Sequence, residues 1–201
     1  MASSTGATTP GTRCSEMAQV TEYAGAAAGT SWTTPENANA DDAAYASYTI
    51  AAKNTTGNEN TLSNFGFDAS IPEAAIISQV DLVVEHKVST GSGIAHLESA
   101  VAIGATVGTF NTDSTEPTTD TQVTYSNVAR PGGGSWARDD LLDGTFTVRL
   151  RARSGNNATS VTYSWDYARV VVTYSMPIGE EVDVPPLGVA SPNVHMTLVA
   201  A

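Results

Sequence analysis

Positive charge, cysteine and long apolar runs are all scarce in this sequence of 201 residues. Nine Lys and Arg residues face 21 Asp and Glu residues, so the formal charge is −12 and the isoelectric point is near 4.4. Such an acidic surface repels a phosphate backbone, and we therefore expect no nucleic-acid partner. Cys14 is the only cysteine and cannot form an internal disulfide. The longest apolar runs are far too short to span a bilayer, so we expect no membrane partner.

The first ten residues, MASSTGATTP, lack the basic and apolar regions of a secretory signal. We therefore expect the protein to be made in a cytoplasm and to reach its destination by assembly. Thr, Ser, Val, Gly and Asn are abundant, whereas Lys, Glu and Leu are scarce. This composition favours a β-rich domain.

The chain divides into three zones. Residues 1–30 are mostly Ala, Ser, Thr and Gly, which predicts an extended N-terminal arm. Residues 31–175 carry nearly all the aromatic side chains and predict one β-sandwich domain. Residues 176–201 are interrupted by Pro177, Pro185-Pro186 and Pro192, which predicts an extended C-terminal tail. The last part of this tail, Val194–Val199, is strand-like in sequence.

Apolar residues recur at every second position in the central zone, as they do in half-buried strands. The pattern is strongest in Ile76–Val88, Thr145–Arg153 and Tyr167–Tyr174. Weaker candidates are Tyr45–Ala51, Leu62–Phe67, Ala95–Ile103, Thr106–Phe110, Gln122–Ser126 and Ser160–Trp165. Only Ser135–Leu142 looks briefly helical. About nine strands at this spacing, with no long amphipathic helices between them, predict an all-β fold, an antiparallel β-sandwich or jelly roll.

Five segments match a known pattern in order and spacing. They are SWTTPENANADDAAYA at 31–46, LSNFGF at 62–67, IPEAAIISQV at 71–80, Trp136–Leu150 and Ala168–Tyr174. Together they resemble a β-sandwich domain of tailed-bacteriophage structural proteins, with Thr34 where Asn is usual and Gln79 where Gly is usual. The resemblance covers about residues 32–174 and implies a structural module of the virion.

The opening motif also makes physical sense on its own. Trp32 stands at a strand entry, where it can plug one end of a sandwich and bury a large apolar area. Pro35 fixes the chain direction before a turn whose Asn and Asp side chains can cap backbone N–H groups.

Catalytic signatures are weak. The three histidines are His86, His96 and His195, and His86 falls on the apolar face of a predicted strand, where a core histidine is the usual interpretation. The sequence contains no Gly-x-Ser-x-Gly elbow, no His-x-x-x-His pair and no P-loop. We therefore expect no enzyme, no catalytic residue and no cofactor.

Carbohydrate chemistry is the main alternative. Trp136, Trp165 and Tyr167 could form a glycan-stacking platform. Acidic residues at 139, 140, 143 and 166 lie close to these aromatic residues in sequence and could serve a glycan hydrolase. We favour structural roles for Asp139 and Asp140 at a helix start and for Asp143 in a turn.

Metal ligands are suggested by one short pattern. Asn37, Asn39 and Asp41 carry oxygen ligands at alternate positions, as calcium loops do, but the Gly and the distal Glu of an EF-hand are missing. Turn capping is the favoured interpretation. Because Cys14 stands alone, we expect no zinc site, and no metal ligand is predicted.

Arginines concentrate on one predicted strand face. Arg149, Arg151 and Arg153 alternate along it, and Arg169 is expected on a neighbouring strand. The stripe is either a solvated, edge-protecting face or a patch that docks an acidic partner. Both interpretations remain open at this point.

These observations predict a non-enzymatic virion protein, specifically a capsid decoration (cement) protein on the outside of the head. Its expected partners are the major capsid protein and neighbouring copies of itself, with a homotrimer as one symmetric arrangement. A neck or tail protein is the alternative in the same class. A carbohydrate-binding adhesin module and a glycan hydrolase are the alternatives in other classes.

Overall fold

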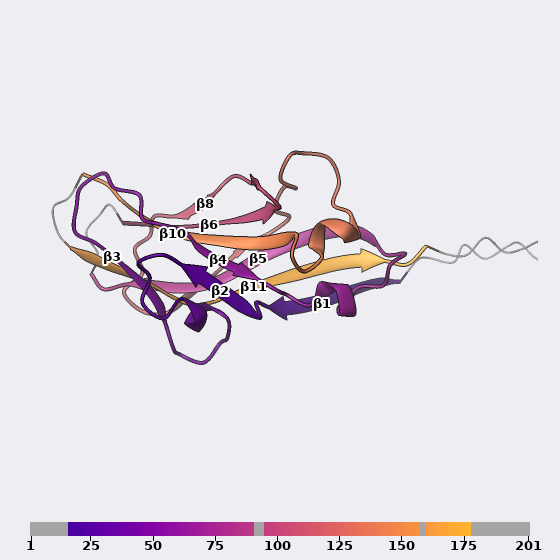
Figure 1. Cartoon of the computed structure of the whole chain (residues 1–201), viewed down its shortest axis with the longest axis horizontal. Coiled ribbons are helices and arrows are strands. Elements are labelled where there is room, and N and C mark those ends of the chain that lie inside the picture. Colours follow the sequence, from indigo (N-terminus) through magenta and orange to yellow (C-terminus); the bar gives the residue numbers. More distant parts are fainter. Residues whose placement is uncertain (1–15, 91–94, 157–159, 178–201) are drawn as a thin grey trace, which may run out of the picture.

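Apolar side chains at every second position fold the chain into antiparallel strands that form two sheets (Figure 1). The structure is a computed structural model, and it describes residues 16–90, 95–156 and 160–177. The strands are β1 Met17–Tyr23, β2 Ala26–Gly29, β3 Ala46–Ile50, β4 Asn60–Ser63, β5 Ile76–Val88, β6 Ala95–Ile103, β7 Thr106–Val107, β8 Asn111–Asp113, β9 Thr121–Tyr125, β10 Phe146–Ser154 and β11 Val161–Ser175. Three single turns of helix accompany them: η1 Pro35–Ala38, α1 Phe67–Ser70 and η2 Arg138–Leu141.

The two sheets pack face to face around one core. The five-stranded sheet has the order β1-β11-β5-β9, and β3 pairs with the first part of β11. The six-stranded sheet has the order β2-β4-β10-β6-β7, and β8 also pairs with β6. Every pairing is antiparallel. The predicted all-β antiparallel sandwich is therefore confirmed.

A bulge in β11 joins two segments that the sequence pattern separates. Trp165 pairs with His86 and Tyr167 pairs with Glu85, so Asp166 is the extra residue. Before the bulge the odd-numbered residues face the core, and after it the even-numbered residues do. The predicted strands Ser160–Trp165 and Tyr167–Tyr174 are one strand because a bulge changes the phase of the alternation without ending the strand.

Trp32 plugs the core as expected. It is 8% exposed, and its indole Nε1 donates a hydrogen bond to the Asn58 carbonyl at 2.9 Å. Its ring lies 5.2 Å from the Trp165 ring and 5.6 Å from the Tyr48 ring, measured between centroids. Gly29 makes room for it, because a Cβ there would lie 2.7 Å from Trp32 Cδ1.

The predicted N-terminal arm is partly wrong. Residues 17–23 form β1, which pairs with β11 from Met17–Ser175 to Tyr23–Arg169, and β2 extends the other sheet beside β4. Backbone hydrogen bonds hold an edge strand even where its side chains are small, and composition alone did not reveal this. The sandwich thus starts at residue 17. The rest of the predicted arm, residues 1–15, and tail residues 178–201 lie outside the described part of the chain.

The weaker predictions are confirmed to different extents. The strand expected over Leu62–Phe67 ends at Ser63, because Asn64 and Gly66 adopt left-handed conformations with φ of 59° and 79° that turn the chain into α1. The short helix expected within Ser135–Leu142 is η2. Among the described residues, no helix is long and apolar enough to cross a bilayer.

Candidate functional site: an apolar end around Trp136

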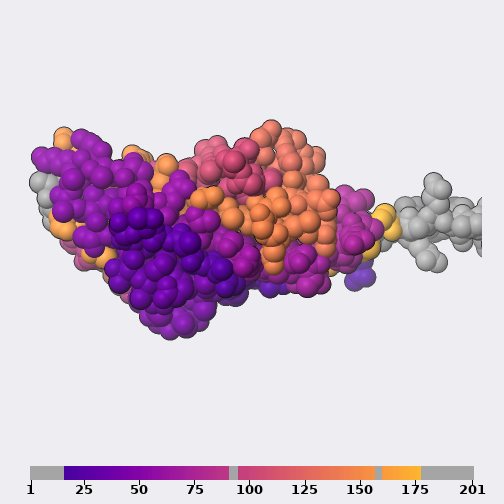
Figure 2. Space-filling view, in the orientation of Figure 1, coloured from indigo at the N-terminus to yellow at the C-terminus, as the bar shows by residue number. Residues whose placement is uncertain are grey.

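Three exposed apolar side chains gather at the end of the five-stranded sheet where β11 finishes. Met17, Ile76 and Met176 are 55%, 57% and 42% exposed, respectively. Met17 lies opposite Ser175, and Ser175 lies opposite Ile76, so Met17 and Ile76 begin the two strands that flank the end of β11, and Met176 follows that end. We call these three residues the apolar end. Figure 2 shows the yellow end of β11 projecting at this end of the molecule. Grouped exposed apolar residues mark a contact surface.

Trp136 stands next to the apolar end and is held by the core. Its indole Nε1 donates to the Val128 carbonyl at 2.9 Å, and its ring meets Phe146 edge-on with 6.1 Å between centroids. The glycine-rich turn before it positions the ring, because Gly132, Gly133 and Gly134 all have φ near +80°, a region that other residues rarely adopt. The ring is only partly buried.

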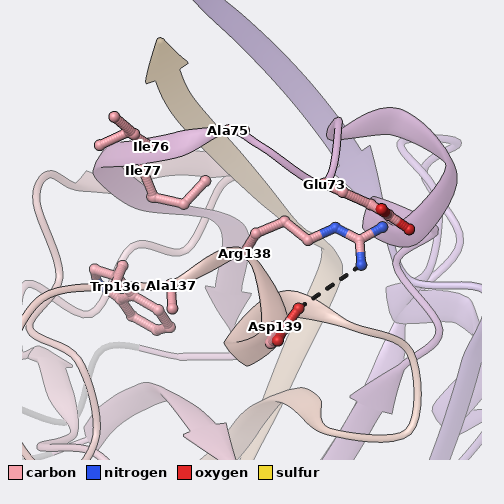
Figure 3. A pocket seen from close by; sticks show the side chains of 8 residues that line it. All are labelled: Glu73, Ala75, Ile76, Ile77, Trp136, Ala137, Arg138 and Asp139. Atoms are coloured by element: carbon pink, nitrogen blue, oxygen red, sulfur yellow. Dashed lines mark ion pairs between the residues drawn. The ribbon is translucent and has the colours of Figure 1, made fainter. Parts of the chain in front are cut away.

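Two hollows flank Trp136. The first has a volume of about 280 Å³ and is lined by Glu73, Ala75, Ile76, Ile77, Trp136, Ala137, Arg138 and Asp139 (Figure 3). The second, of about 320 Å³, is lined by Ile77, Ser78, Asn127, Val128, Ala129, Arg130, Gly134, Ser135 and Trp136. Because Ile77 and Trp136 line both, the hollows adjoin. We call them together the Trp136 groove.

Each hollow contains an arginine with an internal partner. The Arg138 guanidinium donates to the Asp68 carbonyl at 2.8 Å and lies 3.9 Å from Asp139. Arg130 donates to both carboxylate oxygens of Asp140, at 2.7 and 2.8 Å, and these bonds hold the pKa of Asp140 below its ordinary value. The groove is therefore close to electrically neutral although the protein is strongly acidic.

The predicted aromatic platform does not exist as a unit. Trp165 is fully buried, and Tyr167 is 1% exposed with its hydroxyl donating to Gln122 Oε1 at 2.6 Å. Neither ring can stack on a sugar, so the prediction is wrong for these two residues. Trp165 faces the core, whereas Tyr167 faces the other side of the sheet, where its ring packs against Tyr23. Alternation alone did not distinguish such a covered position from an exposed one. Trp136 keeps an accessible surface.

The acidic residues near Trp136 serve the local structure. Asp140 accepts the Ala137 backbone N–H at 2.8 Å and opens η2, as the favoured interpretation predicts. Asp143 accepts the Gly66 N–H at 3.0 Å. The Asp139 side chain is 89% exposed. Three carboxylates with three separate roles do not form the facing pair that glycoside hydrolysis requires.

Asp166 lies elsewhere, at the β11 bulge, and is 2% exposed. Burial raises its pKa, and the neighbouring charges of Asp41 and Asp42 add to that effect. Burial likewise raises the pKa of Glu85, with Asp166 as the next cause. Asp166 and Glu85 thus belong to a separate acidic group, on β11 and β5, and do not lie beside Trp136.

The loop with the calcium-like pattern caps its own turn. Asn37 Nδ2 donates to the Tyr45 carbonyl at 3.4 Å, and Asp42 Oδ1 accepts the Ala44 N–H at 2.9 Å. Asn39 forms a backbone bridge with Tyr167. In residues 16–90, 95–156 and 160–177, no three His, Cys, Asp or Glu side chains are grouped to hold a metal ion. Cys14 lies outside these ranges.

The arginine stripe lies on the outer face of β10 and is paired within the chain. Arg151 and Arg153 donate to the two oxygens of Glu98 at 2.5 and 2.6 Å. Glu98 is 3% exposed; burial alone would raise its pKa, but the two arginines hold it below the ordinary value. Arg149 donates to Thr61 Oγ1 at 2.6 Å.

Arg169 is not a neighbour of this stripe. It belongs to β11 in the other sheet, where it donates to the Tyr23 hydroxyl at 3.1 Å and lies over the Tyr167 ring. The expectation that it extends the stripe is wrong, because β10 and β11 follow each other in sequence but enter different sheets. A docking role for Arg149, Arg151 and Arg153 stays a prediction.

The histidines occupy two kinds of environment. His86 is 1% exposed, and its Nε2 lies 2.8 Å from Asp113 Oδ2. Burial lowers the pKa of His86, and its ring meets Trp165 edge-on inside the core. His96 is partly exposed beside Ser114. His195 lies outside the described residues. His86 thus has the core position that its strand face predicts.

Sequence reasoning missed the apolar end. The available signal was the pair Ile76-Ile77, because two adjacent large apolar residues at a strand start cannot both face one core. Met17 and Met176 flank the first and last strands, and only the pairing register brings them beside Ile76.

Comparisons with known proteins give no family. No protein-family model matches the chain, and no curated protein matches it significantly. Among solved structures, a CBM4 protein is 15% identical and has a TM-score of 0.42, covering 76% of this chain and 92% of its own. The xylan-binding module CBM15 is 12% identical with a TM-score of 0.38, covering 82% and 100%. A cyclase from Fischerella sp. TAU is 12% identical with a TM-score of 0.42, covering 84% and 81%. These likenesses are too low to transfer any ligand or activity to this chain.

Proposed function

We propose that this protein is a non-catalytic structural subunit of a tailed-bacteriophage particle, and specifically a decoration protein on the outside of the head. The observation that carries the proposal is the apolar end, where Met17, Ile76 and Met176 are grouped and exposed on a protein with a formal charge of −12. A subunit that functions alone gains nothing from such a patch, whereas one that packs against a neighbour buries it.

The resemblance to phage structural domains supports the same assignment. Its apolar positions are the ones that hold the sandwich together: Trp32, Leu62, Phe67 and Ile71 are each 8% exposed or less. These positions fit the sandwich core, and the resemblance itself implies a building block of virions. The internal pairing of the acidic and basic clusters also suits a passive, rigid module.

The mechanism of such a subunit is mechanical. Each copy would bury its apolar end on the shell or on a neighbouring copy, and binding to the assembled shell alone stabilises that shell by mass action. Contacts of this kind resist the pressure of packaged DNA without any chemical step. The acidic outer surface would keep undocked copies soluble.

Binding to heads tests the proposal. Expanded heads that lack this protein should take it up in a fixed ratio during sedimentation, and their melting temperature should rise. Ile76→Glu should reduce uptake at least tenfold, because a charge in a buried apolar contact is costly. Val107→Glu is the matched control, since Val107 is also exposed but lies on the other sheet. Absence of uptake by both heads and tails would contradict the assignment to the virion.

A carbohydrate-binding adhesin is the second candidate, and only Trp136 favours it. That ring lies between two hollows and keeps an accessible surface. A glycan array decides the matter: specific glycan binding that Trp136→Ala abolishes and Ile76→Glu spares would replace the structural proposal. Release of reducing sugar that Asp140→Asn abolishes would instead indicate a hydrolase.

A further inference from the structure

We propose that the Trp136 groove and the adjoining Ile76 bind the C-terminal segment Val194–Val199 of a second copy of this chain. The inference deepens the proposed function, because a subunit present in many copies needs a contact between them. It assigns a place in the fold to that contact and names the segment that fills it.

The groove has the shape to receive an extended peptide. Its two hollows, of about 280 and 320 Å³, lie on either side of the Trp136 ring and share Ile77 as their common wall. Figure 3 shows Ile77 and Trp136 on opposite sides of the first hollow, with Ile76 beyond them. A strand places every second side chain about 6.6 Å further along the same face. Successive side chains of a bound strand could therefore enter the two hollows and contact Ile76.

The lining of the groove combines apolar walls with polar and charged groups, among them the carboxylates of Glu73 and Asp139, so it favours an uncharged occupant with some apolar side chains. Its arginines already have partners, since Arg138 bonds backbone carbonyls and Arg130 bonds Asp140. A charged ligand would therefore gain little there, whereas Ile77, Ala75 and Ala129 offer an apolar lining.

Beyond the described sandwich, Val194–Val199 answers this description best, because the uncharged stretch Pro185–Pro192 has only Leu187 and Val189 at alternate positions. In Val194–Val199, Val194, Met196 and Leu198 stand at alternate positions, and the segment contains no Asp, Glu, Lys or Arg. The earlier part of the same tail carries Glu180, Glu181 and Asp183 and is acidic. Residues 1–15 contain no comparable apolar alternation.

The tail is long enough to reach the groove of a neighbouring copy. The chain leaves the sandwich at Met176-Pro177, directly beside the apolar end. Residues 178–193 precede the segment, and Pro185-Pro186 and Pro192 favour an extended path there. At about 3.1 Å per residue, an extended path of these residues could span about 50 Å, which is long enough to reach the groove of a neighbouring copy. A groove on one copy filled by a tail from the next is a heterologous contact, which closes into a ring or continues as a chain of subunits.

Light scattering on the purified full-length chain tests the inference over a concentration series. The wild-type chain should form oligomers. The groove variant Ile76→Glu and the tail variant Met196→Asp/Leu198→Asp should each shift the midpoint of assembly at least tenfold upward in concentration. Val107→Glu serves as the control for an added charge on an exposed apolar residue and should assemble normally. Circular dichroism should show the same strand content in all four proteins.

Mixing the two defective variants is the decisive experiment. The groove variant keeps an intact tail and the tail variant keeps an intact groove, so an equimolar mixture should yield a two-chain species that neither forms alone. Three results would each overturn the inference. They are a monomeric wild-type chain, a tail variant that assembles as the wild type does, and a mixture without a two-chain species. Uptake by heads is a separate result. A monomeric chain that still binds heads would overturn only this inference, and an oligomer that binds no particle would overturn only the proposed function.

Discussion

Single side chains set the stability of this sandwich, and Trp32 is the clearest case. Its ring packs on Trp165 and Tyr48, and its Nε1 is bonded to the Asn58 carbonyl. Trp32→Ala should lower the free energy of unfolding by about 3–5 kcal/mol, because the substitution empties a large volume at the end of the core. Urea denaturation followed by circular dichroism measures this loss. A change of only a few tenths of a kcal/mol would show that Trp32 does not plug the core.

The buried pair His86–Asp113 should make stability depend on pH. Burial lowers the pKa of His86, so below pH of about 6.5 the unfolded chain takes up a proton that the folded chain does not. Burial alone would raise the pKa of Asp113, but hydrogen bonds from Thr115 and His86 hold it lower. Both shifts predict that the free energy of unfolding falls as pH falls below about 6.5 and falls further near the ordinary pKa of Asp.

Thermal melts between pH 4 and 8 measure this dependence. His86→Gln retains a hydrogen-bond donor for Asp113 but no titrating group, so its melting temperature should fall less steeply between pH 6.5 and 5. Equal slopes for the variant and the wild type would contradict the assigned role of His86.

Glu98 should contribute more to the stability of the fold than a glutamate on a solvent-exposed strand face would. It is 3% exposed and pairs with both Arg151 and Arg153. Glu98→Gln removes the charge that these arginines share, and we expect a loss of about 1–3 kcal/mol in chemical denaturation. Glu59→Gln is the control, because the Glu59 side chain is 33% exposed and lies 3.6 Å from Arg149. Equal losses of stability for the two variants would mean that Glu98 and its two arginines form only a solvated surface pair.

Residue-level reasoning from sequence succeeded where burial follows directly from strand phase. His86 is the example, since it stands at a position of β5 that faces inward by alternation, whereas Trp32 lies in the turn after β2 and its burial was expected from the size of its ring. It failed for Trp165 and Tyr167, because the bulge at Asp166 places residues on both sides of it in buried positions. A one-residue insertion in a ladder leaves no distinct compositional signal.

At the scale of elements, the first strand is the main departure from expectation. β1 contributes seven paired residues along β11, although its sequence, MAQVTEY, has only one large aliphatic side chain facing inward. Deleting residues 1–15 should leave the melting temperature unchanged, whereas deleting residues 1–24 should lower it by at least several degrees, because the edge of β11 loses its partner. Differential scanning calorimetry compares the two. Equal melting temperatures would show that β1 does not belong to the cooperative unit.

The long strands β5 and β10 could be predicted because each one alternates over nine or more residues, whereas β6 is buried at most of its positions and gave a weaker pattern. Their order in the sheets could not. β10 and β11 are consecutive and similar in pattern, yet they enter opposite sheets, which separates Arg169 from the arginine stripe. Strand order depends on which faces pack together, and every alternating strand offers the same kind of face.

At the scale of the whole molecule, the apolar end and the Trp136 groove lie together, beside the point where the described chain leaves the sandwich. Neither feature could be predicted from composition, because Met17, Ile76 and Met176 are far apart in sequence. Their convergence is a consequence of register across three strands. It gives the molecule one surface suited to a neighbour, whereas its charged clusters are paired internally.

The most direct test of the proposed function is a cryo-EM map of intact tailed-phage particles assembled in the presence of this protein. The account predicts density for this sandwich at repeated, symmetry-related positions on the particle surface, with the apolar end buried against a neighbouring subunit. A well-resolved particle that contains no copy of the sandwich, or copies whose apolar end faces solvent, would contradict it.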